Sequence, residues 1–449
     1  MPVVQPPGFE PFDQQIQALL DPFGRFGVEL GLERIQRLLG ALGNPQVRVP
    51  LVHVAGTNGK GSVCAYLAAV LQAAGYRVGR YTSPHLVSWR ERITVNNAPI
   101  QAQDLIQRLH QVVAAIDPAQ PSPTQFEVFT AAAWLHFAEA EVDLAVMEVG
   151  LGGRLDATNV VDAPLVSVIT SLSREHWQRL GPTLADIARE KAGVLKSGRP
   201  AVIGPLPAEA AAVVKARIAE LNCPVVWPTP AIPIEHGKAC YGSGDNAIAY
   251  PLALLGQHQL VNSAVAIAAL HSLRDQGWQI ANEAIVEGMA KARWPGRLQW
   301  VTWGQESAGY PLLIDGAHNT AAAEVLRQYV DSWWTSQSGQ PEGTAWLMGM
   351  LATKDHRDIF AALLRPGDAL HLVPVPEHET AIPEELGAIA RSVCPRLAQC
   401  EIHDSLSDGL TALGRTSGAL KVLCGSLYLI GHFLATEPYQ DQPPGSLAP

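Results

Sequence analysis

The strongest constraint on the fold is an alternation of two kinds of segment that begins at residue 51. Short β-branched runs predict buried strands at 51–55, 143–150 and 164–170, and another strand ends near Tyr81. Longer Ala- and Leu-rich segments predict helices at 62–74, at 126–141 and after Pro182. Such alternation produces a mostly parallel sheet with helices on both faces. The predicted fold class is therefore α/β.

The length of the chain and a break in its pattern predict two domains. A chain of 449 residues exceeds the size of one hydrophobic core. Residues 256–292 look helical throughout, and Pro295-Gly296 then interrupts the pattern and predicts a hinge at 293–300. A second, smaller α/β series follows, with strands predicted at 311–315, 344–349, 368–374 and 421–424. We expect a first domain at 1–296 with a short N-terminal helical segment, a second at 297–436, and a disordered tail at 437–449.

The composition and charge of the chain indicate which kinds of binding partner to expect. The net charge of −10 gives no reason to expect nucleic acid, and no apolar run approaches the roughly 18 residues of a membrane span. The N-terminus lacks a signal-peptide pattern, and the six cysteines show no metal-binding spacing, which is typical of reduced thiols. We expect a cytoplasmic monomer that acts on small molecules and binds neither nucleic acid nor membrane.

The stretch "LVHVAGTNGKGSVCAYLAAVLQAAG" at 51–75 resembles a phosphate-binding loop with unusual spacing. In the common loop, four residues separate the first Gly from a Gly-Lys pair, and Ser or Thr follows the Lys directly. Here only two residues separate Gly56 from Gly59-Lys60, and Gly61 lies between the lysine and Ser62. Glycines let backbone N–H groups face phosphate oxygens at a helix start, and Ser62 could reach Mg²⁺. A tight connection that needs small residues is the alternative, and the loop alone does not decide.

Polar residues also follow the other strands of the first domain. In open α/β sheets ligands bind beyond the carboxyl ends of the strands, and Ser83, Glu148, Glu175 and His176 lie at such ends. Taken singly, Glu148 could be a solvated strand end, His176 a loop histidine and Lys191 a surface charge. Together with the loop they predict a metal–nucleotide site, because each falls independently at the same sheet edge.

The second domain adds residues at its own strand ends. Asp315 ends one strand and could bind a ribose or cap a helix, and Arg297 at the hinge could clamp a phosphate or lie on the surface. His318 follows Asp315 at a helix start. The remaining candidates are Asn319, Lys354, Asp355 and Ser426.

Ten sequence blocks occur in an order that resembles one enzyme family. They are "AGTNGKGS", "TSPHL…RERI", "FEVFTAAAWLHF", "EVGLGGRLDATN", "LGPTLADIAREKAGVLK", "GQHQLVNSAVA", "PGR", "DGAHN", "KD" and "CGSLYLIG". The pattern, from about residue 31 to 431, is similar to folylpolyglutamate synthase/dihydrofolate synthase of the Mur ligase superfamily. The resemblance implies a P-loop-containing, ATPase-like domain followed by a smaller Rossmann-like domain. It also implies an ADP-forming amide ligase that activates a carboxylate as an acyl phosphate before L-glutamate attacks.

The resemblance also implies roles for individual residues. The implied cofactors are ATP and Mg²⁺, with a monovalent cation such as K⁺ as a further candidate, and the implied catalytic residues are Lys60, Lys191 and His318. ATP would be bound by Thr57, Asn58, Gly59, Lys60, Gly61, Ser62, Asn262, Arg297 and Asp315. The metal would be held by Ser62, Ser83, Glu148, His176 and Lys191, the last as a carbamylated lysine. The pterin pocket would draw on Glu29, Leu30, Phe126, Glu127, Leu155, Asp156 and Ala157, and Ser426 would lie with His318 near the incoming glutamate.

One position departs from the family pattern, and alternatives stay open. The family commonly has Asp before the metal-site His, whereas this chain has Glu175 before His176. Alternative functions are a cell-wall Mur ligase acting on a UDP-sugar peptide and a non-catalytic nucleotide-binding protein. Only residues 1–50 precede the strand before the loop, which we expect to leave no room for a separate UDP-binding domain. Whether dihydropteroate, folylglutamates or both accept glutamate is also left open.

Overall fold

The computed structural model describes residues 11–24, 31–235, 237–304, 309–336 and 343–442. The chain divides into two compact units. The N-terminal unit contains Glu10–Ala253 and Gln259–Arg293, and the C-terminal unit contains Leu254–His258 and the chain from Trp294 onward. Each unit is built on a largely parallel sheet, so the predicted α/β class is confirmed.

The N-terminal unit contains an eight-stranded sheet in the order β4-β3-β2-β5-β1-β6-β7-β8. The strands from β2 to β8 in that order pair in parallel, and β3 and β4 add an antiparallel edge. Every residue of β1 is buried, as expected of a strand covered on both faces. In spatial order the strands are β4 (Ala98–Pro99), β3 (Ile93–Val95), β2 (Val78–Tyr81), β5 (Leu144–Glu148), β1 (Leu51–Ala55), β6 (Val166–Ile169), β7 (Ala201–Ile203) and β8 (Val225–Val226).

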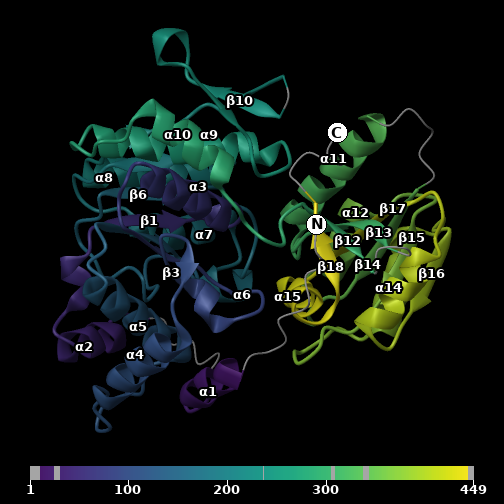
Figure 1. Cartoon of the computed structure of the whole chain (residues 1–449), viewed down its shortest axis with the longest axis horizontal. Helices are drawn as coiled ribbons and strands as arrows, with labels where there is room; N and C mark the ends of the chain where they lie inside the picture. The colour runs from purple at the N-terminus through teal and green to yellow at the C-terminus, as the bar shows by residue number, and fades with distance from the viewer. Residues whose placement is uncertain (1–10, 25–30, 236, 305–308, 337–342, 443–449) are drawn as a thin grey trace. The chain divides into compact units, whose positions relative to one another are not determined.

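Helices cover both faces of this sheet, with α3, α9 and α10 on one side and α4 and α5 on the other (Figure 1). Helix α3 is buried without interruption from Gly61 to Leu71, so it is apolar all round rather than amphipathic. The helices of the unit are α1 (Pro11–Leu20), α2 (Glu33–Ala41), α3 (Lys60–Ala73), α4 (Ala102–Ala114), α5 (Gln125–Glu139), α6 (Trp177–Leu180), α7 (Leu184–Lys191), α8 (Ala208–Leu221), α9 (His258–Arg274) and α10 (Asn282–Lys291). Short 3-10 helices are η1 (Pro45–Arg48), η2 (Trp89–Arg92), η3 (Ala192–Val194) and η4 (Gly244–Asn246).

The structure extends the predicted pattern between residues 200 and 292. The sequence analysis assigned no elements to β7, α8 and β8, or to the antiparallel sheet of β9 (Ile232–Ile234), β10 (Lys238–Tyr241) and β11 (Ile248–Pro251). The helical segment predicted at 256–292 is two helices, α9 and α10. They are separated by a turn in which Gly277 has φ +95°.

The C-terminal unit contains a seven-stranded sheet in the order β16-β15-β14-β17-β13-β12-β18. The strands from β16 to β13 pair in parallel, whereas β12 and β18 pair antiparallel at the other edge. In spatial order they are β16 (Gln399–Ile402), β15 (Ala369–Leu372), β14 (Thr344–Met348), β17 (Leu420–Cys424), β13 (Tyr310–Ile314), β12 (Gln299–Trp303) and β18 (Tyr439–Asp441). The four strands predicted in this region are confirmed.

One prediction about the C-terminal unit is wrong. The segment from 437 was expected to be disordered, yet Tyr439–Asp441 forms β18. This strand pairs with β12, and Gln442 N–H donates to the Trp300 carbonyl at 3.1 Å. Sheet pairing therefore orders the start of a Pro-rich tail, and residues 443–449 lie outside the described part.

In the described part of the C-terminal unit, five helices lie on the two faces of its sheet (Figure 1). Apolar residues of α11, α12 and α13 form one core with Trp346, Leu370 and Leu372. On the opposite face, Gly409 of α14 lies against Leu347 and Val373. The helices are α11 (Thr320–Ser336), α12 (His356–Leu363), α13 (Pro383–Val393), α14 (Leu406–Gly414) and α15 (Leu427–Thr436). None of the described helices is both long and apolar enough to cross a membrane.

Candidate active site

The loop between β1 and α3 is shaped by close contacts that require glycine. Gly59 has φ +85° and directly precedes α3, and a Cβ there would lie 2.4 Å from Asn262 Oδ1. Gly56 is equally restricted, because a Cβ there would lie 2.0 Å from Thr170 Oγ1. The loop is therefore packed closely against the end of β6 and against α9.

Polar residues after β6 hold the loop from the side. Thr170 Oγ1 donates to the Asn58 carbonyl at 2.6 Å, and Ser171 Oγ donates to the same carbonyl at 3.0 Å. The N–H groups of Thr57 and Asn58 donate to the carbonyl and the hydroxyl of Ser171. These contacts position the predicted loop residues. Thr170 and Ser171 were not singled out from the sequence, although their place at a strand end was a usable signal.

A cation and a carboxylate face each other beside the loop. Lys60 Nζ donates to the Thr57 carbonyl at 3.0 Å and lies 3.9 Å from Glu148 Oε1. Glu148 Oε2 accepts the Ser83 N–H at 3.3 Å, so the ends of β2 and β5 also meet here. Glu148 is only 5% exposed, so its charge is poorly screened by solvent. The structure thus brings together Lys60, Ser83 and Glu148, as predicted.

Lys191 lies in the same cluster although it is far away in sequence. It ends α7, is 5% exposed, and its Nζ donates to the Gly56 carbonyl at 2.7 Å. Burial, with the charge of Lys60, lowers the pKa of Lys191 to about 7, while Glu175, Asp156 and Glu148 oppose the shift. An appreciable fraction of its amine is therefore uncharged near neutral pH, which is the nucleophilic form.

Ser62 and Asn262 are joined by a residue that sequence reasoning missed. Gln259 Nε2 donates to Ser62 Oγ at 3.2 Å, and Asn262 Nδ2 donates to Gln259 Oε1 at 3.1 Å. Gln259 and Asn262 lie three residues apart on α9, so both side chains share one helix face. That spacing in "QLVN" was the available signal. Asn262 therefore lies in the same unit as the loop, beside Gly59.

His176, the histidine predicted to bind the metal, lies on a different kind of backbone. His176 is exposed and directly precedes α6 in a left-handed conformation, with φ +51°. Its neighbour Glu175 is half-buried and lies near enough to Lys191 to influence the pKa of that lysine. The acidic residue that departs from the family pattern therefore contributes to the electrostatics around Lys191.

The predicted pterin residues fall into two groups, and Glu29 and Leu30 lie outside the described residues. The Glu127 side chain has partners within the protein. It accepts the Thr124 N–H in a capping box and forms an ion pair with Arg34 Nε at 3.1 Å. Asp156 accepts the N–H groups of Leu151 and Thr158 and the Thr158 hydroxyl. Burial raises the pKa of Asp156.

Of the other residues of this set, Phe126 and Leu155 are partly exposed and Ala157 is buried. Phe126 is half-buried and packs so closely on the turn after β5 that a Cβ at Gly150 would lie 2.5 Å from its ring. Leu155 is half-buried, and Ala157 is buried in the core of the unit.

In the C-terminal unit, Asp315 and Arg297 organise the turn after the hinge. Asp315 accepts the N–H groups of Leu298 and Ala317, each at 2.8 Å. Burial raises the pKa of Asp315, against the opposing charge of Arg297. His318 Nδ1 lies 2.8 Å from the Gly316 carbonyl. The structure therefore brings Asp315, Arg297 and His318 together at one strand end.

Ser426 and Asp355 both precede helices of the C-terminal unit. Ser426 is 2% exposed and accepts the Tyr428 N–H at the start of α15. Asp355 precedes α12 without a capping hydrogen bond from its side chain. The predicted glutamate contact of Ser426 therefore coincides with a helix cap.

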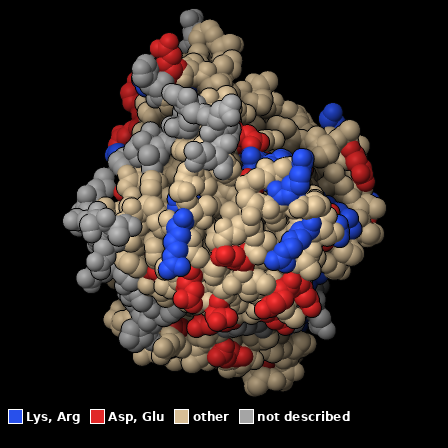
Figure 2. Space-filling view, turned by 90° about the vertical axis from the view of Figure 1, so that its right-hand side faces the viewer, with Lys and Arg blue, Asp and Glu red and all other residues tan. Residues whose placement is uncertain are grey.

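The surface charges are mixed in sign. Figure 2 shows acidic and basic side chains on the same face, with uncharged residues covering most of it. A nucleic-acid-binding surface gathers Lys and Arg along one face. The face drawn in Figure 2 instead carries Asp and Glu as well as Lys and Arg.

Comparison with known proteins places this geometry in context. Residues 54–270 match the model of the Mur ligase middle domain, and residues 299–436 match that of the dihydrofolate synthetase C-terminal domain. The chain is 39% identical to dihydrofolate synthase/folylpolyglutamate synthase of Bacillus subtilis over 68% of this chain and 73% of that protein. It is 34% identical to folylpolyglutamate synthase of Lacticaseibacillus casei over 92% and 95%. The solved structure of Escherichia coli FolC in complex with DHPP and ADP superposes with a TM-score of 0.79 at 29% identity, over 96% and 98% of the two chains.

Proposed function

Because the chain belongs to the dihydrofolate synthase/folylpolyglutamate synthase family, we propose that it adds L-glutamate to dihydropteroate and to the γ-carboxylate of folylglutamates. The family is one of ATP-dependent carbon–nitrogen ligases, and the chain is such a ligase. The choice of acceptor rests on the names of its relatives, which include both activities.

One observation carries the proposal: Lys60, Glu148 and Lys191 gather around the loop from Gly56 to Ser62. Phosphoryl transfer needs cations and N–H donors arranged before the reaction around the phosphate oxygens. Loop N–H groups and the positive end of α3 would bind the phosphates, and Lys60 would stabilise charge on the transferring group.

The proposed reaction has two steps. An acceptor carboxylate oxygen attacks the γ-phosphorus of ATP, and ADP leaves. The amine of glutamate then attacks the acyl carbon, loses a proton and expels inorganic phosphate, which leaves an amide. Arg297, Asp315 and Asn262 are proposed to contact ATP, and His318 and Ser426 to lie near the glutamate. Phe126, Leu155 and Ala157 are proposed pterin contacts, with Glu127 and Asp156 shaping the pocket rather than binding directly.

The donor atoms near the loop fit Mg²⁺, which prefers oxygen ligands. Ser62, Ser83 and Glu148 would supply these oxygens, His176 is proposed as a further ligand, and the ion when bound would neutralise charge on the phosphates. A carbamylated Lys191 would add an anionic oxygen, and the lowered pKa of this lysine favours that modification. Intact-mass measurement in bicarbonate buffer tests the carbamate. ADP release in K⁺ compared with Na⁺ tests a monovalent cation.

The test of the function is ADP release with a panel of acceptors. The proposal predicts release with Mg–ATP, glutamate and either dihydropteroate or a reduced folate, and no release with a UDP-sugar peptide. Lys60→Ala should abolish release, and Lys291→Ala, which changes a side chain 69% exposed on α10, should not. Release that is indifferent to pteroate and folate acceptors would sink the substrate assignment. Lack of turnover with every acceptor would favour the non-catalytic alternative.

The proposal also covers the domain boundaries, the cellular compartment and the oligomeric state. The catalytic domains are proposed to be residues 1–296 and 297–436, with the chain acting as a cytoplasmic monomer. All six cysteines are free, which accords with a reducing compartment. Light scattering at the concentration used for the assay tests the monomer, and a dimer mass would contradict it.

A further inference from the structure

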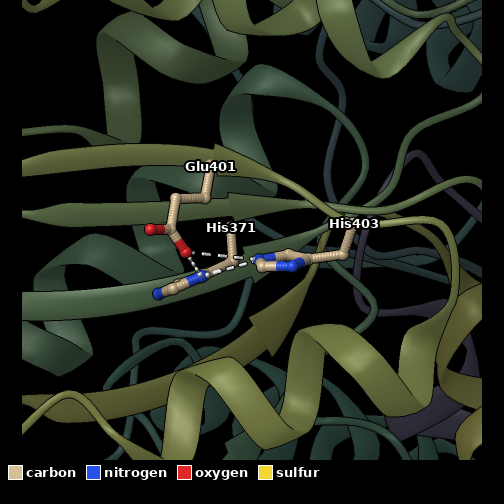
Figure 3. Close-up of side chains that lie close together, drawn as sticks. All are labelled: His371, Glu401 and His403. Atoms are coloured by element: carbon tan, nitrogen blue, oxygen red, sulfur yellow. Dashed lines mark hydrogen bonds and ion pairs between the residues drawn. The ribbon is translucent and has the colours of Figure 1, made fainter.

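Two histidines and a glutamate, none of them assigned to the reaction, converge on one face of the C-terminal sheet (Figure 3). His371 lies on β15, and Glu401 lies directly opposite it on the edge strand β16. His403 follows β16, and its N–H donates to the Leu372 carbonyl, so the pairing continues past the end of the strand. Side chains alternate along a strand, so Glu401 and His403 share the face of His371.

The three donor atoms form a compact triangle. His371 Nδ1 lies 3.0 Å from His403 Nε2 and 3.7 Å from Glu401 Oε2, and His403 Nε2 lies 3.8 Å from the same oxygen. The centre of a triangle with these sides lies about 2.0 Å from each corner, which matches the Zn–N and Zn–O bond lengths of roughly 2.0–2.2 Å. An ion at this centre would lie at bonding distance from all three atoms and would replace the hydrogen bond between the two imidazoles.

From this geometry we propose that His371, Glu401 and His403 bind a divalent transition-metal ion, Zn²⁺ by preference. Imidazole nitrogens with one carboxylate are a ligand set suited to Zn²⁺ rather than to Mg²⁺ or Ca²⁺. Three protein ligands leave a fourth position, which water can fill because the Glu401 side chain is 47% exposed. The site differs in place and ligand chemistry from the Mg²⁺ site proposed at the phosphate loop.

The surroundings of His371 set how tightly the ion is held. His371 is completely buried, so solvent does not compete for its ring nitrogens. Its second nitrogen, Nε2, is also buried and has no hydrogen-bond partner among the described residues. Metal-binding histidines usually donate that second N–H to an acceptor, which strengthens the site. We therefore expect micromolar rather than nanomolar affinity.

A metal ion at this site would stabilise the edge of the C-terminal sheet. Strand β16 is the outermost strand and pairs on one side with β15 alone, so an ion held by His371 from β15 and by two residues of the β16 segment would cross-link the two strands. Removal of the metal should loosen β16 and leave the phosphate loop intact. Hydrogen exchange at residues 399–403 reports on this directly.

The test is metal titration of the full-length chain after treatment with a chelator, with excess Mg²⁺ present to saturate Mg²⁺-binding groups. We expect one equivalent of Co²⁺ to bind with a visible absorption band and to be displaced by Zn²⁺. His403→Gln and Glu401→Gln should each weaken Zn²⁺ binding at least tenfold. His110→Gln, which removes an exposed histidine from α4, is the matched control and should bind as the unaltered chain does.

Two results would overturn the proposal. One is a titration in which the unaltered chain takes up no more metal than His403→Gln does. The other is unchanged affinity in Glu401→Gln, which serves as the second variant if His403→Gln fails to fold, because the Glu401 side chain is half-exposed. Neither readout uses ligase activity, so failure here is distinguishable from failure of the proposed reaction.

Discussion

The conformation of single residues decides whether the phosphate loop can form. Gly59 and Gly75 stand near the two ends of α3 with similar positive φ angles of +85° and +91°. They differ in surroundings, because a Cβ at Gly59 would collide with Asn262 whereas nothing lies within 4 Å of a Cβ at Gly75. Substituting alanine at Gly59 and at Gly75 therefore separates two free-energy costs: that of a left-handed backbone and that of a steric clash.

We predict that Gly59→Ala destabilises the chain by roughly 2–4 kcal/mol and lowers kcat/KM for ATP at least tenfold, since it displaces Asn262. Gly75→Ala should cost only about 1–2 kcal/mol, from its left-handed backbone alone, and leave kcat/KM unchanged. Chemical denaturation and ADP release measure the two effects. Equal kinetic losses in both variants would contradict the assignment of the loop.

A buried histidine gives a prediction about pH. Burial, with a smaller contribution from Lys196, lowers the pKa of His53 to about 3, and its Nε2 lies 2.8 Å from Thr158 Oγ1. The unfolded chain, with a His pKa near 6.5, binds more protons than the folded chain between about pH 3 and 6.5, so stability falls as pH falls through this window.

We predict that His53→Gln, which cannot titrate, loses less stability on acidification than the unaltered chain, by at most roughly 1.4 kcal/mol per pH unit below pH 6.5. Thermal unfolding midpoints between pH 7 and 4.5 measure the difference. The exposed His110→Gln variant should follow the unaltered chain. Parallel curves for His53→Gln and the unaltered chain would show that His53 is not buried in its neutral form.

At this scale the sequence predicted which residues of the phosphate loop region lie together. Lys60, Glu148 and Lys191 were predicted to meet because strand ends share an edge, and they do. Glu127 was predicted to bind the pterin. Its carboxylate forms a capping box with Thr124 and an ion pair with Arg34. The partner Arg34 comes from α2, and no local pattern reveals a contact across 93 positions of sequence.

The packing of helices on each other depends on where small residues fall. Gly288 of α10 faces α3 so closely that a Cβ there would lie 2.3 Å from the Val70 Cα. Gly40 of α2 has open space around it. Both positions are helical, so the two glycines differ in contact rather than in backbone conformation.

We predict opposite signs for the same substitution at these positions. Gly288→Ala should destabilise by roughly 1–3 kcal/mol because it forces α10 away from α3. Gly40→Ala should stabilise by about 0.4–1 kcal/mol, since alanine restricts the unfolded chain. Denaturation midpoints measure both, and stabilisation by Gly288→Ala would mean that α3 and α10 are not in contact.

Elements with strong patterns were predictable, and exposed or antiparallel elements were not. The strands β1, β5 and β14 are buried throughout and mostly apolar, as is β17 apart from the half-buried Lys421. By contrast, β8 and β9 are exposed throughout, so hydrophobic periodicity gives no signal there. Strand β18 follows a Glu-Pro pair and is formed by long-range pairing with β12.

At the scale of the whole molecule, each unit carries its own hydrophobic core. Clusters around Phe129 and Ile203 lie in the N-terminal unit, and a cluster around Trp346 lies in the C-terminal unit. The phosphate loop, Lys60, Glu148 and Lys191 all belong to the N-terminal unit. The nucleotide phosphates should therefore stabilise that unit directly.

We predict that Mg–ADP raises the unfolding transition of the N-terminal unit, by about 2.7 kcal/mol at a concentration 100-fold above its Kd. Calorimetry measures the shift, and Lys60→Ala supplies the control because it should shift much less. Stabilisation of equal size in Lys60→Ala would place the phosphates elsewhere.

The central claim is that ATP cleavage is coupled to a new glutamyl amide, and the most direct test is to quantify both products in one reaction. Purified chain is incubated with Mg–ATP, glutamate and either dihydropteroate or tetrahydrofolate, and ADP and the glutamylated product are measured by mass spectrometry. The account predicts one ADP for each glutamate added, with neither product formed by Lys60→Ala. ADP formed without a glutamylated pteroate or folate would contradict it.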